Sequence, residues 1–347
     1  MASWGDFHKV AGAGWSVFWR LTDEGGGMQV WWADFAGRRV MWKGSQPFAI
    51  VPYHFPLPPG AQPGPPDSTF KDGLGAQCEG AAFTPLKMGA PNANVQNQPQ
   101  WKATVDTEAV SVRVEPGGNF GPDELVIEAK FMCGWYQYVQ RWTFDSYGQI
   151  VADLGMGGAV NPGAPDAAHV HHMYFRVDLD IDGFSSDAFE VFKHSSFDDT
   201  AGGDAWSNPK SKQGKFKLDP PTARKFRVRD LTSALPNVKS TRGYEIEIPA
   251  LAGTDAHSTA DIWATVYRGD NVEQGADVSC VDSQLDAYAT GPLDTKRGSD
   301  IVCWVVVRHH HEPRHEAEEQ TFLPYHYEGF HIVPRAFATI RNAHQDG

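Results

Sequence analysis

The most constraining feature of this 347-residue chain is the stretch from Ala168 to Gly183. Read as an extended strand, it has two distinct faces, because successive side chains of a strand point to opposite sides of the sheet. One face carries two imidazoles and then an apolar series: His169, His171, Met173, Phe175, Val177, Leu179 and Ile181. The other face ends in three carboxylates: Asp178, Asp180 and Asp182. The pattern predicts a strand that turns its histidines toward an apolar interior and its carboxylates away from it.

The rest of the chain predicts an all-β fold built from antiparallel strands. Glycine occurs 35 times and proline 24 times, which implies many turns, and the sequence shows no long helical stripe. Further strands are expected at residues 15–21, 28–35, 39–42, 104–114, 124–132, 136–144, 149–154, 225–229, 244–248, 262–268 and 300–307. Residues 188–215 are polar and are expected to form a long excursion. A chain of this length can bury one large core, so we expect one main unit.

Composition excludes some classes of partner. The chain has 30 Lys and Arg against 43 Asp and Glu, a net charge of -13, which argues against nucleic acid or an anionic membrane as partner. The longest strongly apolar run, residues 301–307, is too short to span a bilayer. No apolar stretch follows a basic segment near the N-terminus, so we expect a cytoplasmic location. The four cysteines are widely spaced and form no zinc motif, and both one disulfide and four free thiols remain open.

The histidines of the central stretch have the spacing of a metal site. His169 and His171 lie on one side of a strand, roughly 6.5 to 7 Å apart at the backbone, so both rings can reach one ion. Imidazole pairs favour copper or zinc. In residues 301–307 the odd positions lead in phase to His309 and His311, so a third imidazole can arrive at a strand end. The alternative is a set of ordinary core histidines and a solvated histidine run.

The carboxylates suggest a different kind of metal. The pattern Asp178-x-Asp180-x-Asp182-Gly183 is similar to the opening of an EF-hand loop, in which oxygen ligands recur at alternate positions. The twelfth position would be Phe189 instead of Glu, and no flanking helices are apparent, so we reject that motif. A calcium site on a strand and an acidic edge that faces solvent both remain as interpretations.

Several segments together resemble the copper amine oxidases. His169-x-His171 with residues 175–183 is similar to the strand that carries two copper ligands in that family. Residues 300–304 with His311 are similar to the strand that carries the third ligand. Other similar segments are residues 49–53, which match a segment with an active-site tyrosine, residues 73–75 and residues 330–337. These segments occur in the family's order along nearly the whole chain.

The resemblance implies a fold, a reaction and an assembly. The fold would be the large antiparallel β-sandwich of the family's catalytic domain, here a single domain over residues 1–347 without the family's small N-terminal domains. The reaction would be the oxidative deamination of a small primary amine to an aldehyde, with O2 reduced to hydrogen peroxide and ammonia released. The family also implies a homodimer.

The resemblance assigns the copper centre residue by residue. His169, His171 and His311 would bind copper. Tyr136 falls where the family converts a tyrosine into the quinone cofactor topaquinone. Tyr53 matches the tyrosine that hydrogen-bonds this cofactor.

Two carboxylates compete for the role of catalytic base. Asp67 matches by its distance after Tyr53. The family's local pattern Phe-Asp-x-Gly reads here Phe70-Lys71-Asp72-Gly73, so Asp72 is the rival. A carboxylate in an apolar cleft has a raised pKa and can accept a proton from carbon.

The resemblance also implies a calcium-type site at the acidic end of the central strand. Its ligands would be the side chains of Asp178, Asp180 and Asp300 and the carbonyl groups of Leu179 and Ile301. These positions account for carboxylates on the face opposite the histidines.

The cofactor motif departs from the family. The pattern Asn-Tyr-Asp or Asn-Tyr-Glu reads here Trp135-Tyr136-Gln137, so the tyrosine is kept and both neighbours differ. An indole is bulkier than a carboxamide and can block rotation of the neighbouring ring, and Gln137 removes a charge. Three functions therefore stay open: an amine oxidase with topaquinone, a copper oxidase or oxygenase that keeps Tyr136 unmodified or crosslinked and acts on a non-amine, and an inactive copper-binding protein.

Overall fold

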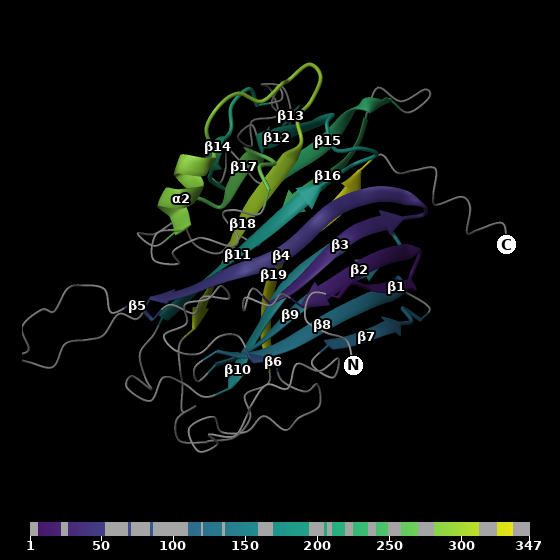
Figure 1. Cartoon of the computed structure of the whole chain (residues 1–347), viewed down its shortest axis with the longest axis vertical. Helices are drawn as coiled ribbons and strands as arrows, with labels where there is room; N and C mark the ends of the chain where they lie inside the picture. Colours follow the sequence, from purple (N-terminus) through teal and green to yellow (C-terminus); the bar gives the residue numbers. More distant parts are fainter. Residues whose placement is uncertain are drawn as a thin grey trace, which may run out of the picture.

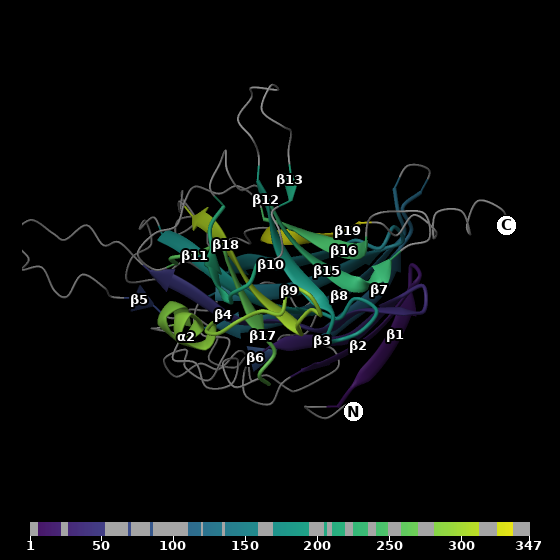
Figure 2. The same ribbon diagram turned by 90° about the horizontal axis from the view of Figure 1, so that it is seen from above.

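Strands dominate the computed structural model (Figure 1). The structure describes residues 6–21, 27–52, 69–70, 84–85, 110–118, 121–133, 136–158, 169–193, 205–206, 210–218, 225–234, 241–248, 258–269, 281–311 and 325–335. These residues form two large antiparallel sheets and one helix. In Figure 1 the second sheet lies behind the first, and Figure 2 shows the two layers from above. The predicted all-β sandwich is therefore confirmed.

The first sheet has nine strands and contains the central stretch as β11. Its order is β1-β2-β3-β4-β11-β18-β17-β14, with β5 paired to β4. The bounds are β1 His8–Gly12, β2 Trp15–Leu21, β3 Met28–Phe35, β4 Arg38–Pro52, β5 Thr69–Phe70, β11 His169–Leu179, β14 Gly214–Phe216, β17 Ile262–Val266 and β18 Ile301–His311. Strand β11 is thus an inner strand, with β4 on one side and β18 on the other.

The second sheet has ten strands and carries Tyr136 at the start of β9. Its order is β13-β12-β15-β16-β19-β10-β9-β8-β6, with β7 paired to β8. The bounds are β6 Thr84–Pro85, β7 Val110–Glu115, β8 Glu124–Cys133, β9 Tyr136–Asp145, β10 Ile150–Gly158, β12 Asp187–Lys193, β13 Ala205–Trp206, β15 Lys225–Ala234, β16 Thr241–Glu247 and β19 His326–Arg335.

The main core lies between the two sheets. Phe175 of β11 meets Phe330 of β19 with ring centroids 5.1 Å apart, and Trp15 of β2 meets Phe144 of β9 at the same distance. A Cβ atom at Gly44 would lie 2.5 Å from Trp142, a buried core residue, so this position requires glycine. Burial of such large apolar side chains is the dominant favourable term for folding.

Part of the outer face of the first sheet is covered as well, which the sequence analysis did not predict. Helix α2, Val281–Tyr288, packs beside β17 and buries Val281 and Leu285 in a second apolar cluster with Tyr174 and Trp304 (Figure 1). Asp282 of this helix accepts a hydrogen bond of 2.7 Å from the hydroxyl of Tyr174. The face of β11 opposite the main core therefore packs, at Tyr174, against a second and smaller apolar cluster.

The predicted strands are found with some corrections. Residues 15–21 and 28–35 form strands as expected, whereas the expected strand at 39–42 is part of the much longer β4. The polar excursion expected at 188–215 is wrong at its start, because β12 occupies Asp187–Lys193 and buries Phe189 and Val191 in the core. Among the described residues, no helix has the length and apolar character needed to cross a bilayer.

Candidate metal centre

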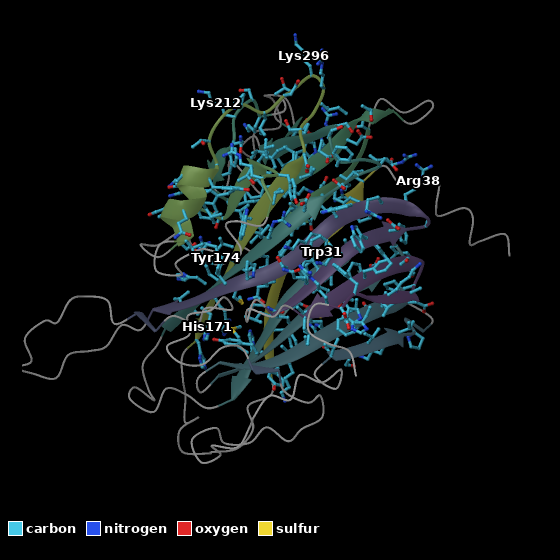
Figure 3. The ribbon with its side chains drawn as sticks, viewed as in Figure 1. Trp31, Arg38, His171, Tyr174, Lys212 and Lys296 are labelled. Carbon is cyan, nitrogen blue, oxygen red and sulfur yellow. The ribbon has the colours of Figure 1, made fainter. Side chains whose placement is uncertain are left out.

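The pairing of β11 with β18 brings the histidines of two distant segments together. His169 lies opposite His311 and His171 lies opposite His309 in the register of these antiparallel strands. The ring of His171 is buried, and its centroid lies 5.8 Å from that of His311. Figure 3 shows His171 near the start of β11, at the end of the sheet where β18 finishes.

The spacing of these rings suits a shared metal ion. An imidazole bound through one nitrogen at roughly 2.0 to 2.1 Å has its centroid roughly 3.2 Å from the ion, so two rings on one ion lie at most about 6.4 Å apart. The His171 and His311 centroids fall within this limit. The donor set is also suitable, because imidazole is a good ligand for copper. The predicted copper ligands His171 and His311 therefore fit one ion, while for His169 the structure describes only the backbone.

The face of β11 that carries His171 looks toward the second sheet. The ring of Tyr138, on β9, meets the ring of His171 edge to face with centroids 6.4 Å apart. Tyr138 is fully buried in the main core and lies two residues after Tyr136, the first residue of β9. The backbone of Tyr136 pairs with Cys133 and Gly158. The strand that begins with Tyr136 thus passes directly beside a candidate copper ligand.

Other predicted catalytic residues lie outside what the structure describes. These are Tyr53, Asp67, Asp72 and Trp135, together with the side chains of Tyr136 and Gln137. Their assigned roles stay predictions.

The predicted carboxylates gather at the other end of β11. Asp178, Asp180 and Asp300 each offer an oxygen, and these atoms lie within 4.8 Å of one another. Asp178 also forms an ion pair of 3.0 Å with the buried guanidinium of Arg176. Asp182 does not join them, because the chain turns at this residue with a φ of 60° and its carboxylate pairs with Arg38 and Arg242. Asp300, just before β18, takes its place. Asp178 and Asp180 are buried and Asp300 is half-buried, so the interpretation of an acidic edge facing solvent is wrong.

Burial makes negative charge costly in this acidic cluster. Burial, with a further contribution from Asp178, raises the pKa of Asp180 to about 7. Burial and the charges of Asp178 and Asp180 raise the pKa of Asp300 to about 7. Asp187, which the sequence analysis did not consider, lies close enough for its pKa to be raised by burial and by Asp180. A divalent cation held by oxygen ligands would remove this repulsion.

A second group of metal-type ligands, which the sequence analysis missed, lies beside His171 and His311. His309 of β18 and His326 and Glu328 of β19 offer ligand atoms within 4.8 Å of one another. The rings of His309 and His326 are stacked with centroids 4.3 Å apart. Burial lowers the pKa of His309 to about 4, so its ring is neutral at pH 7. The alternation of His326 and Glu328 was the one signal in the sequence for this group.

Comparison with known proteins agrees with the fold. The family model described as copper amine oxidase, enzyme domain, matches residues 96–345. The chain therefore belongs to the copper amine oxidase family. Among the protein's relatives, the peroxisomal copper-containing amine oxidases alpha 2 and alpha 3 of Arabidopsis thaliana are 28% and 27% identical over 220 and 215 residues. Each match covers 56% of this chain and 30% of the plant enzyme.

Solved structures show the same fold. A copper-containing benzylamine oxidase from Hansenula polymorpha aligns with a TM-score of 0.66 at 20% identity, covering 94% of this chain and 59% of that one. An amine oxidase from Aspergillus nidulans aligns with a TM-score of 0.67 at 14% identity, covering 96% of this chain and 52% of that one. The chain thus spans little more than half the length of these enzymes.

Proposed function

We propose that this chain is a copper-dependent oxidase that deaminates a small primary amine, with O2 as the oxidant. The observation that carries the proposal is the convergence of His171 and His311, with ring centroids 5.8 Å apart, beside the β9 strand that begins with Tyr136. Membership of the copper amine oxidase family supports the reaction class. Copper and a topaquinone derived from Tyr136 would supply the redox chemistry and the carbonyl that an amine attacks.

The chain's own residues would hold the metal and move one proton. His169, His171 and His311 would bind copper through neutral imidazoles, which leaves positions open for water or O2. Asp67, with Asp72 as the rival, would accept the proton from the carbon next to the amine nitrogen. Tyr53 would hydrogen-bond the cofactor and hold its ring in position.

A reconstitution experiment tests this function. The metal-free protein is incubated aerobically with Cu(II), and the visible spectrum is followed before and after phenylhydrazine, which reacts with a quinone carbonyl. We expect a visible band and a stoichiometric adduct in the unmodified protein, and neither in Tyr136→Phe. His171→Ala should bind less copper and form no adduct. A copper-loaded protein that stays colourless and unreactive would eliminate the topaquinone proposal.

The altered neighbours of Tyr136 favour a second candidate function. Trp135 and Gln137 replace the residues that flank the cofactor tyrosine in the family, so a copper oxidase or oxygenase that keeps Tyr136 unmodified or crosslinked is the alternative. It would act on a non-amine or on a biosynthetic intermediate. Copper-dependent O2 uptake without a phenylhydrazine adduct would identify this function. Absence of uptake over a broad substrate panel would instead indicate an inactive copper-binding protein.

The proposal includes calcium and a dimer. Asp178, Asp180 and Asp300, with the carbonyl groups of Leu179 and Ile301, would hold calcium, since the three side chains supply clustered oxygen ligands. The homodimer follows from family membership and is tested by light scattering of the purified protein.

A further inference from the structure

We infer that His309, His326 and Glu328 form a second transition-metal site, which takes a divalent cation of the zinc or copper(II) class. The three residues come from β18 of the first sheet and β19 of the second, and their ligand atoms lie within 4.8 Å of one another. Two imidazoles with one carboxylate are a ligand set that zinc and copper(II) accept.

The distances in this group match those around one ion. Nδ1 of His309 lies 3.4 Å and Nε2 of His326 lies 3.0 Å from Oε1 of Glu328. Ligands that hold zinc tetrahedrally at roughly 2.0 to 2.1 Å lie roughly 3.3 Å from one another. Small rotations of these side chains therefore suffice to place an ion between them.

A cation can reach this site from solvent, and the three protein ligands leave a coordination position open. The side chains of His309 and Glu328 are 16% and 22% exposed, whereas that of His326 is 58% exposed. A cation can thus enter from the His326 side, and water can complete its coordination. Three protein ligands with an open position are the arrangement of zinc sites that exchange a ligand.

This site is separate from the proposed copper centre but adjacent to it. The His309 ring lies 6.2 Å from both His171 and His311 between centroids, close to the limit of about 6.4 Å that only rings on nearly opposite sides of one ion reach. The same ring lies 4.3 Å from His326, and its Nδ1 faces Glu328. Two ions bound at once would be close neighbours, so two copper(II) ions would show magnetic coupling.

Metal titration tests the inference with the full chain. Metal-free protein in saturating calcium, which occupies the acidic cluster, is titrated with Zn²⁺ in a calorimeter, and bound metal is then counted by mass spectrometry. We expect two equivalents of zinc in the unmodified protein and one in both His326→Ala and Glu328→Gln. His331→Gln is the matched control, since His331 is exposed on the same strand outside the group, and it should keep two equivalents.

A separate variant, His171→Ala, is the control for the proposed copper centre in this titration. His171→Ala should lose one equivalent and keep the other, so failure of the proposed copper centre and failure of this site give different results. With copper(II), electron paramagnetic resonance should show coupled spins in the unmodified protein and an isolated spin in His326→Ala. Thermal melts confirm that each variant is folded.

The simple alternative is a hydrogen-bonded group in which Glu328 accepts one N–H from each imidazole. One equivalent of zinc in the unmodified protein that His171→Ala loses and His326→Ala keeps would support that alternative and overturn the inference. Two equivalents in both His326→Ala and Glu328→Gln would overturn it as well, because the second ion would then be bound elsewhere.

Discussion

Replacing Asp300 by asparagine isolates the energetic cost of the acidic cluster. The substitution keeps the shape of the side chain and removes one of three carboxylates whose oxygens lie within 4.8 Å of one another. Asp182→Asn is the matched control, because Asp182 belongs to the same sequence pattern but pairs with Arg38 and Arg242 outside the cluster.

The magnitude follows from the pKa of Asp300. Its pKa is about 7 in the folded protein against an ordinary value of 3.8. Without a cation, the folded protein holds a proton that the unfolded chain has already released, so stability falls as the pH rises from about 4 to about 7 and then levels off. The full pKa difference between the folded and unfolded states corresponds to a loss of roughly 4 kcal/mol in the free energy of unfolding. Because Asp300 is partly exposed and the three acids titrate together, we halve this loss of stability to about 2 kcal/mol.

The assay is thermal unfolding at pH 6 and pH 8, in chelator and in calcium. In chelator at pH 8 we expect Asp300→Asn to melt at or above the temperature of the unmodified protein, because the repulsion is gone. Calcium should raise the melting temperature of the unmodified protein, and more at pH 8 than at pH 6, since protons compete for the same oxygens. It should not stabilise Asp300→Asn, whereas Asp182→Asn should keep the calcium response.

Comparing the variant with the unmodified protein at the same pH removes the contribution of histidine titration, because the histidines are the same in both proteins. The reasoning is refuted if, in chelator at pH 8, Asp300→Asn is clearly less stable than the unmodified protein. It is also refuted if calcium stabilises both proteins equally, since the cluster would then bind no calcium.

Three further predictions concern packing, a buried ion pair and the cofactor motif. Gly44→Ala should destabilise the protein by about 1 to 3 kcal/mol in denaturant melts, because the new methyl group overlaps Trp142; an unchanged melt would contradict this contact. The guanidinium of Arg308 lies 2.5 Å from the buried carboxylate of Asp261. Arg308→Met removes this partner and should lower the free energy of unfolding by about 3 to 5 kcal/mol in the same assay. A loss below about 1 kcal/mol would show that water replaces the guanidinium. Trp135→Asn should speed the growth of the visible band after aerobic copper addition, and an equal or slower rate would contradict the argument from indole bulk.

The sequence predicted the part of the fold that is governed by strand alternation. The apolar series after His171 identified which face of β11 enters the core, and the phase of residues 301–307 placed His311 on the matching face of β18. The resemblance to the family supplied the meeting of these histidines at one copper ion, which alternation alone does not give. The convergence of His171 and His311 was therefore predictable.

The missed features depend on contacts between distant segments. Helix α2 has only eight residues, and only two of them, Val281 and Leu285, are buried, so its sequence shows no clear stripe. Asp182 continues the alternation of Asp178 and Asp180, but a turn with positive φ takes it out of the cluster. The group of His309, His326 and Glu328 forms only where β18 meets β19 of the other sheet, and periodicity within one strand carries no signal for such a meeting.

The two faces of β11 place both proposed ion sites on one strand. Imidazoles stand on one side near its start and acids on the other side at its end, so deleting one residue in the middle would invert every position downstream and point the acids into the core. Substitutions along this strand can change the size of its side chains, but a one-residue deletion would reverse which side chains face the core. The number of residues between the histidines and the aspartates should therefore resist insertion and deletion far more than the loops around it.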